Sequence, residues 1–338
     1  MRIAINGFGR IGRTFLRVLL QEQGKKNGLE VAVINCGPME LPAAAHLFKF
    51  DTTMGTYPDP VAYRDGFLHI GPHKIALLAE VDLSAVSWEK YGIEWVVDCS
   101  GRYTHTGAAR AHLAQGAKRV LISAPAPGAD CTIIPGINDG FYDPAKHHIV
   151  SLGSCTTNAL LPLIKVLQER AGIENAAIVT VHSYTNAQAL LDGSCKHGTD
   201  LRRCRTATEN IIPTGTGAGA LVGQLFPELA GKVSALALRV PVSNVSLVEV
   251  HAQLKRDISV PALHEFFTHA SQNSLQGIVA LSHEPLVSSD FLGNSHSVII
   301  DTPLTTMAGK LVSLYGWYDN EWGYSCRLRD FLAQRAQF

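Results

Sequence analysis

The segment Gly7-Phe8-Gly9-Arg10-Ile11-Gly12 constrains the fold most, because it joins a short apolar strand at residues 2–6 to an apolar-faced helix. In a Gly-x-Gly-x-x-Gly turn the glycines permit a tight turn, close approach of a pyrophosphate and close packing of helix on strand. The helix N-terminus then favours the anion. A second strand at 29–34 completes a β-α-β unit. The sequence therefore predicts a dinucleotide site that includes Gly7, Gly9, Arg10, Ile11 and Gly12.

Strands and helices continue to alternate after this unit. We expect strands at 95–98 and 119–122 and helical stretches at 83–90 and 106–115. This alternation is typical of a doubly wound parallel sheet. Because ligands bind at the carboxyl ends of such strands, four residues are expected near the cofactor: Ser100, Gly101, Ser123 and Ala124.

The end of the second strand is unusual. An NAD site commonly has an Asp or Glu there to bind a ribose hydroxyl, but this chain has Asn35-Cys36-Gly37-Pro38. The ribose hydroxyl would then be bound either by Glu40 or by backbone groups alone. Since neither Asn35 nor Cys36 repels a 2′-phosphate, the sequence predicts NADP and/or NAD as cofactor.

Cys155 is the candidate nucleophile. It lies between an apolar strand at 148–153 and a helical pattern that Gly172 ends. N–H groups and the dipole at a helix N-terminus favour a thiolate over a thiol. The alternative is an ordinary buried cysteine, which most cysteines are. We also expect a bend at Pro162, because an interior proline costs a helix roughly 3 kcal/mol.

The regular alternation of strands and helices ends after the helix that begins near Cys155. A strand at 176–184 contains His182, and the long segment 187–211 contains three arginines, including Arg203. Residues 214–220 open another helix as a second anion cradle. Arg239 lies in a predicted strand, where it needs an anion or a carboxylate partner. An α+β domain with a mainly antiparallel sheet is indicated by strands at 235–240, 245–254, 278–281, 297–301 and 310–317, and a helix at 261–271.

The length of 338 residues suits two domains. We expect a dinucleotide-binding domain at 1–154, joined by a C-terminal helix at 321–338, and a catalytic domain at 155–320. The predicted fold class is α/β: a Rossmann-type doubly wound parallel sheet plus the α+β catalytic domain.

Composition restricts the partners. Lys plus Arg equals Asp plus Glu, at 29 each, so nucleic acid is not indicated as the main partner. No apolar run approaches the ~20 residues that cross a bilayer, and we expect no signal peptide, because the N-terminus enters a strand directly. Seven scattered cysteines favour reduced thiols. Without His-Glu-x-x-His or Cys-x-x-Cys, no metal is expected, and the predicted location is the cytoplasm.

These parts suggest a dehydrogenase that passes through a thioester. The Cys155 thiolate would add to an aldehyde, and His182 would take the proton as hydride leaves for the nicotinamide. Backbone N–H groups at the helix start would stabilise the oxyanion. Phosphate can then accept the acyl group, which would explain more than one anion site.

Four segments closely resemble the phosphorylating glyceraldehyde-3-phosphate dehydrogenases: 6–13, 154–158, 239–241 and 317–321. The resemblance covers essentially the whole chain. It implies reversible oxidation of D-glyceraldehyde 3-phosphate to 1,3-bisphosphoglycerate in glycolysis or gluconeogenesis, with Cys155 as nucleophile and His182 as its acid/base partner. Asn320 would hold the nicotinamide amide, with Tyr324 near the ring. The substrate phosphate would bind Thr185 and Arg239, and inorganic phosphate would bind Ser154, Thr156, Thr216, Gly217 and Arg203.

Members of this family are homotetramers in which the long loop, here 187–211, reaches a neighbour's cofactor. Three departures from the family pattern stand out. Cys36 replaces the usual Asp, and Ser194 replaces a proline, as in the NADP-using branch. Ala159 replaces a second cysteine, which should not harm catalysis.

Two alternatives remain. Erythrose-4-phosphate dehydrogenases, which release the acyl group to water, are similar at 320–323. They usually lack Tyr184-Thr185 and Thr216-Gly217, which this chain has. A non-catalytic binding protein on the same scaffold would be marked by loss of Cys155 or His182, and both are present. The phosphorylating reaction is therefore the expectation.

Overall fold

The computed structural model describes residues 1–21, 28–194 and 200–336, which form two compact units. The first comprises residues 1–154 and the chain from Ser325 onward, and the second comprises Cys155–Tyr324. Cys195 and the last two residues of the predicted C-terminal helix lie outside the described residues.

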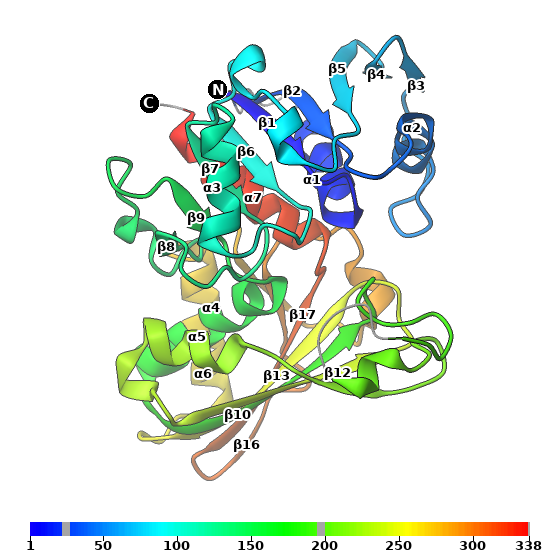
Figure 1. The fold of residues 1–338 in the computed structure, drawn as a ribbon. Helices are drawn as coiled ribbons and strands as arrows, with labels where there is room; N and C mark the ends of the chain where they lie inside the picture. Colours follow the sequence, from blue (N-terminus) through cyan, green and yellow to red (C-terminus); the bar gives the residue numbers. More distant parts are fainter. Residues whose placement is uncertain (22–27, 195–199, 337–338) are drawn as a thin grey trace. The chain divides into compact units, whose positions relative to one another are not determined.

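A nine-stranded sheet forms the centre of the first unit as far as it is described (Figure 1). Its strands are β1 (Arg2–Asn6), β2 (Glu30–Asn35), β3 (Val61–Arg64), β4 (Phe67–Ile70), β5 (His73–Leu78), β6 (Trp95–Asp98), β7 (Arg119–Ile122), β8 (Cys131–Thr132) and β9 (Ile149–Ser151). Their order is β3-β4-β5-β2-β1-β6-β7-β9-β8. The pairs from β5 to β8 are parallel, whereas β3–β4 and β4–β5 are antiparallel.

The helices of this unit are α1 (Arg10–Gln21), α2 (Leu41–Lys49), α3 (Thr106–Ala114) and the part of α7 (Trp322–Arg335) from Ser325 onward. The helical stretch predicted at 83–90 is wrong as a single helix. Two 3-10 turns occur there instead, at Leu83–Ala85 and Glu89–Tyr91. Val86 between them is extended, and Trp88 is fully buried, so packing of the indole overrides the local helical pattern. A third 3-10 turn spans Asp139–Phe141.

A buried polar network holds the carboxyl ends of β1 and β6. The Asp98 carboxylate accepts hydrogen bonds from Asn6 Nδ2 at 2.7 Å and from Ser100 Oγ at 2.9 Å. His112 Nε2 lies 3.1 Å from the same carboxylate, and Trp88 Nε1 donates to His112 Nδ1 at 3.2 Å. Because an indole N–H can only donate, Nδ1 is the acceptor and Nε2 carries the proton toward Asp98. The network therefore fixes the tautomer of His112.

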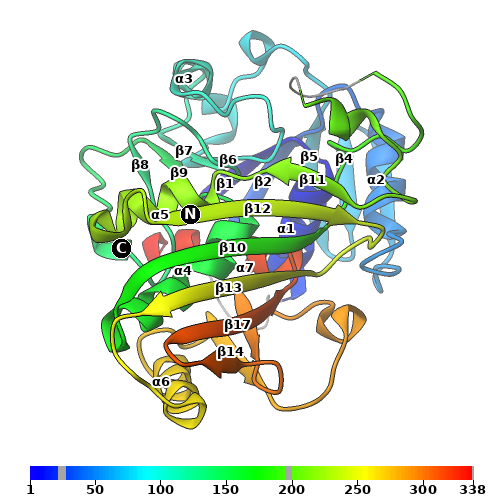
Figure 2. The ribbon, with the colours of Figure 1, turned by 90° about the horizontal axis from the view of Figure 1, so that it is seen from below.

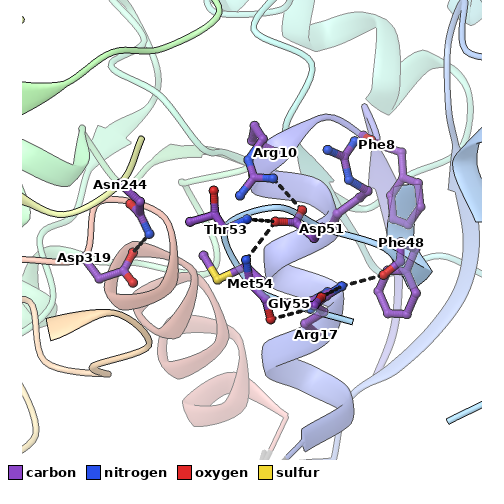
Figure 3. Close-up of polar contacts among 11 residues, drawn as sticks. Phe8, Arg10, Arg17, Phe48, Asp51, Thr53, Met54, Gly55, Asn244 and Asp319 are labelled. Carbon is purple, nitrogen blue, oxygen red and sulfur yellow. Dashed lines mark hydrogen bonds and ion pairs between the residues drawn. The ribbon is translucent and has the colours of Figure 1, made fainter. Parts of the chain in front are cut away.

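Arginines on α1 hold the segment after α2 (Figure 3). Arg10 pairs with Asp51, whose carboxylate also accepts the N–H groups of Thr53 and Met54 at 2.9 Å. Burial acts to raise the pKa of Asp51, but these donors outweigh it and the pKa lies below its ordinary value. Arg17 donates to three carbonyl oxygens, those of Phe48, Met54 and Gly55.

The second unit, in its described part, contains an eight-stranded sheet (Figure 2). Its strands are β10 (Ile173–Ser183), β11 (Ile212–Gly215), β12 (Val233–Val240), β13 (Ser246–Leu254), β14 (Val279–Ser282), β15 (Val298–Asp301), β16 (Thr306–Ala308) and β17 (Leu311–Tyr318). The order is β11-β12-β10-β13-β17-β15-β14, with β16 beside β17. Only β10–β12 and β14–β15 are parallel among these described pairs. The predicted fold class is confirmed.

Three helices belong to this unit as described: α4 (Cys155–Arg170), α5 (Ala218–Leu225) and α6 (Val260–Gln272). Short 3-10 turns occur at Leu201–Cys204, Pro227–Leu229 and Ser288–Phe291. α4 continues through Pro162 as one helix. Gly172 follows the end of α4 with a φ of +69° and donates its N–H to the Leu167 and Gln168 carbonyls. This left-handed conformation favours glycine as a helix terminator.

Candidate active site

A pocket of about 200 Å³ lies at the carboxyl ends of β1, β2 and β6 in the first unit. Five residues predicted to bind cofactor line it: Gly7, Gly9, Asn35, Cys36 and Ser100. Six other predicted residues do not line this pocket: Arg10, Ile11, Gly12, Gly101, Ser123 and Ala124. The Ser123 N–H donates to the Asp98 carbonyl at 3.0 Å, which ties the end of β7 to that of β6.

The three glycines of the loop fit a dinucleotide for separate reasons. Gly7 has a φ of +92°, and a Cβ there would meet the Ser100 backbone at 2.5 Å. A Cβ on Gly12 would collide with the Gly7 carbonyl oxygen. Nothing lies within 4 Å of the Cβ position of Gly9, so this side of the loop is open. Gly7 and Gly12 therefore permit the tight turn, and Gly9 leaves room for a pyrophosphate.

The two lining residues at the end of β2, Asn35 and Cys36, carry no negative charge. Burial raises the pKa of the Cys36 thiol to about 12 against a lowering by Arg13, so Cys36 is neutral at physiological pH. Glu80 and Arg102 line the same pocket with opposite charges. Both were missed in the sequence because they lie far along the chain from Cys36. Glu40 lines a neighbouring hollow instead.

Cys155 and His182 form a pair in the second unit. Cys155 begins α4 and His182 lies one residue before the end of β10, with Sγ 3.6 Å from Nε2. His182 Nδ1 lies 2.7 Å from the Ser183 carbonyl oxygen. Since a carbonyl can only accept, Nδ1 carries the proton, and the Nε2 of the neutral ring presents its lone pair to Sγ. This tautomer suits a base for the thiol.

Burial keeps both members of this pair uncharged. It lowers the pKa of His182 to about 3, Arg239 adds to the lowering, and the Ser183 carbonyl opposes it. Burial also raises the pKa of the Cys155 thiol, although Arg239 and Thr156 act to lower it. The donors at the helix start therefore act in the predicted direction, toward the thiolate, but loss of water around Sγ outweighs them.

Arg239 on β12 is the charged group beside this pair. It is opposite His182 in the β10–β12 register, and its Nη1 donates to the Ser183 carbonyl at 3.2 Å. Burial lowers its pKa, Cys155 raises it, and Arg203 lowers it as a like charge. Within the described residues its buried Nε has no partner. Among the described residues, a carbonyl and not a carboxylate meets the predicted need of Arg239 for a partner, so an anion would satisfy both arginines.

Tyr318 is a part of the site that sequence reasoning missed. Its hydroxyl lies 3.1 Å from Thr156 Oγ1 and 2.7 Å from Thr180 Oγ1, and Thr180 donates to a carbonyl of β13. Its ring meets that of His182 edge to face at 5.9 Å between centroids. Tyr318 therefore orients Thr156 and His182. A signal was available, because Tyr318 stands two residues before Asn320 in a segment already singled out.

The other residues predicted to bind phosphate or nicotinamide have fewer contacts with the Cys155–His182 pair. Thr216 accepts the Ala218 N–H at the start of α5, where Gly217 is the N-cap, and Thr185 donates to Gln188. Across the described chain, no hydrogen bond or ion pair links four predicted residues to the Cys155–His182 pair: Thr185, Ser194, Thr216 and Gly217. Ser154 directly precedes Cys155. Asn320 and Tyr324 are buried, with exposed fractions of 6% and 4%.

The cysteines differ from expectation at one position. Cys204 is disulfide-bonded, whereas Cys36, Cys99, Cys131, Cys155 and Cys326 are free. The prediction of reduced thiols is therefore wrong for Cys204. It rested on spacing along the chain, which does not report distances in the fold.

The described residues contain no group of three or more His, Cys, Asp or Glu that could hold a metal ion. They also contain no helix with the length and apolar character needed to span a membrane.

Comparison with known proteins places both units in one family. Residues 1–106 match the family described as "Glyceraldehyde 3-phosphate dehydrogenase, NAD binding domain", and residues 154–320 match its C-terminal domain. Glyceraldehyde-3-phosphate dehydrogenase of Kitasatospora aureofaciens is 45% identical over 332 residues, which is 98% of each chain. The Geobacillus stearothermophilus enzyme is 43% identical over 99% of this chain and 98% of its own. Glyceraldehyde-3-phosphate dehydrogenase 2 of Bacillus subtilis is 42% identical over 99% and 97%. The chain belongs to the glyceraldehyde-3-phosphate dehydrogenase family.

Proposed function

We propose that this chain catalyses the reversible oxidative phosphorylation of D-glyceraldehyde 3-phosphate to 1,3-bisphosphoglycerate with NAD(P). The observation that supports this most directly is the Cys155–His182 pair, with Sγ 3.6 Å from the unprotonated Nε2. The match to an NAD binding domain and the open glycine loop support NAD(P) as cofactor. The alternative of a non-catalytic binding protein is not favoured, since the nucleophile and its base are both intact.

The residues of the chain account for the proton and acyl steps. His182 Nε2 takes the proton of Cys155 as Sγ forms a bond to the aldehyde carbon. N–H groups at the start of α4 stabilise the resulting oxyanion, and His182 then holds its proton as the thioester forms. The chemistry that NAD(P) supplies when bound is acceptance of a hydride from that carbon. A phosphate oxygen then bonds to the acyl carbon, the C–S bond breaks, and Cys155 leaves as thiolate and takes back the proton that His182 holds.

Two anion sites serve this reaction in the proposal. Thr185 and Arg239 bind the phosphate of the aldehyde, and Arg239 has a buried Nε available for it. Inorganic phosphate binds at Ser154, Thr156, Arg203, Thr216 and Gly217. Arg203 and Arg239 repel one another, and a phosphate dianion bound at each site would offset that repulsion.

Phosphate should behave as a true co-substrate. Without it, the thioester persists, so we expect a burst of about one reduced cofactor per active site followed by slow turnover. Arg203→Ala should raise KM for phosphate by roughly 10- to 100-fold, because charge-assisted bonds are lost. Arg202→Ala, in the same turn but exposed, is the matched control. Full turnover without phosphate and release of the free acid would indicate the erythrose-4-phosphate type.

Cofactor preference should depend on Cys36. An Asp there would repel a 2′-phosphate, and like charges about 4 Å apart at an effective dielectric of 20 repel by roughly 4 kcal/mol. Cys36→Asp should therefore lower the NADP-to-NAD ratio of kcat/KM by roughly 10- to 1000-fold. Cys36→Asn is the uncharged control and should leave the ratio near wild type. A wild type that already favours NAD a thousandfold, unchanged in Cys36→Asp, would contradict the charge argument.

The roles that we propose for the two domains and for the remaining site residues follow the resemblance to the family. We propose that residues 1–154 with the helix at 321–338 bind the dinucleotide and residues 155–320 perform the chemistry. Asn320 and Tyr324 would hold the nicotinamide, and Ser194 of a neighbouring subunit would reach a 2′-phosphate. The protein would be a cytoplasmic homotetramer acting in glycolysis or gluconeogenesis. Light scattering should give four times the chain mass of 36.5 kDa; a monomer mass would rule out the role of Ser194.

A further inference from the structure

The side-chain oxygen of Asn320 is held by two serines from different strands. Ser183, at the end of β10, donates its hydroxyl to Asn320 Oδ1 at 3.0 Å. Ser246, at the start of β13, donates to the same oxygen at 2.9 Å. All three side chains are buried, and the serines are 0% and 1% exposed. A flip of the amide would leave both buried hydroxyl protons without their acceptor, so the amide has one preferred orientation.

Ser183 also joins Asn320 to the catalytic pair. Its N–H donates to Ser246 Oγ at 3.1 Å. Its carbonyl accepts from His182 Nδ1 at 2.7 Å and from Arg239 Nη1 at 3.2 Å. One residue therefore orients the base through its backbone and Asn320 through its hydroxyl. These two roles can be separated by mutation, because alanine removes the hydroxyl and keeps the carbonyl.

The backbone of Asn320 is fixed independently by its neighbour Asp319. The Asp319 carboxylate accepts from Asn244 Nδ2 at 2.9 Å (Figure 3) and from the Gly293 N–H at 2.8 Å. It also accepts the N–H groups of Glu321 and Trp322, at the start of α7. With both backbone and Oδ1 held, Nδ2 is the group of Asn320 that remains to bind a ligand. Within the described residues no hydrogen bond uses it.

We propose that Ser183 and Ser246 are positioning residues that preset Asn320 Nδ2 as a hydrogen-bond donor to the carboxamide oxygen of the nicotinamide ring. The proposal rests on the proposed function, since it assumes that NAD(P) binds. A donor of fixed orientation favours a carbonyl acceptor over a neutral group that accepts weakly. The serines thereby fix the orientation of the Asn320 amide that the nicotinamide carboxamide meets.

The test is equilibrium binding of NAD and its thionicotinamide analogue, whose sulfur accepts hydrogen bonds poorly, measured by calorimetry. Wild type should bind NAD more tightly than the analogue. The variant with Ser183→Ala and Ser246→Ala should bind NAD roughly tenfold more weakly and lose most of the preference over the analogue. Each single variant should show part of the loss, which keeps the test decisive if the double variant folds poorly. Ser313→Ala, which removes a hydroxyl hydrogen-bonded to His251 elsewhere in the sheet, should change neither constant.

A second readout separates positioning from damage to the pair. Alkylation of Cys155 by iodoacetamide should stay within about twofold of wild type in the serine variants, because the Ser183 carbonyl is retained. Unchanged selectivity between NAD and the analogue in all serine variants would contradict the positioning role of the serines and leave the proposed function intact. A wild-type chain that binds neither NAD nor NADP would overturn the proposed function together with it.

Discussion

Replacing Cys155 by serine should lower kcat for aldehyde oxidation by at least about 10⁴-fold while the fold is retained. This loss corresponds to roughly 5 kcal/mol of transition-state stabilisation. Burial already raises the pKa of the Cys155 thiol, and a serine hydroxyl in the same surroundings ionises far less readily. The neutral His182 that faces Sγ would also have to remove a hydroxyl proton, which is held more tightly than a thiol proton.

The measurement is steady-state turnover of the purified variant, with circular dichroism to verify the fold. Cys131→Ser is a control, because Cys131 is also a free cysteine, buried and with a pKa raised to about 12. The control should keep wild-type activity and wild-type labelling by iodoacetamide. Residual activity of Cys155→Ser within tenfold of wild type would show that another residue is the nucleophile.

Local patterns predicted β1, α1, β2, β6, α3, β7 and β9 of the dinucleotide half, whereas α2 and the strands β3 to β5 were not predicted. The glycine loop specifies the turn from β1 to α1 because a Cβ on Gly7 or on Gly12 would collide with the backbone. The hairpin of β3 and β4 was missed although Asp65-Gly66 joins them, with φ values of +51° and +80°. Asp-Gly between apolar residues is a strong hairpin signal. The two turns around Val86 could not be foreseen, because they depend on the burial of Trp88.

In the candidate site, too, some features could be predicted from the local sequence and others depend on the fold. Cys155 and His182 were predicted from motif and resemblance, and the structure brings them within 3.6 Å. Their protonation was not predictable, because burial is a property of the fold and here it outweighs the helix N-terminus. The nearness of Arg102 to Cys36 in one pocket also depends on the sheet order, since β2 and β6 flank β1.

Replacing His182 by asparagine should lower kcat by roughly 10²- to 10⁴-fold, the range for loss of a positioned acid/base. Asparagine can donate to the Ser183 carbonyl and so keeps much of the local geometry, but it cannot take the Cys155 proton. The effect should therefore fall on kcat, with the binding of NAD(P) nearly unchanged. A matched control is His251→Asn, which changes a histidine paired with Glu249 and Ser313 in the same sheet.

The pH dependence of alkylation separates a base from a structural histidine. In wild type, Cys155 reacts with iodoacetamide as His182 takes its proton, which requires a thiol and a neutral imidazole. The pKa of His182 is lowered to about 3 and that of Cys155 is raised, so the rate should be nearly constant from about pH 5 to 8. In His182→Asn only the ionised thiol reacts, and the rate should fall about tenfold per pH unit below the thiol pKa. The difference between the two proteins therefore grows as the pH falls. Parallel profiles for wild type and His182→Asn would show that His182 does not act as the base.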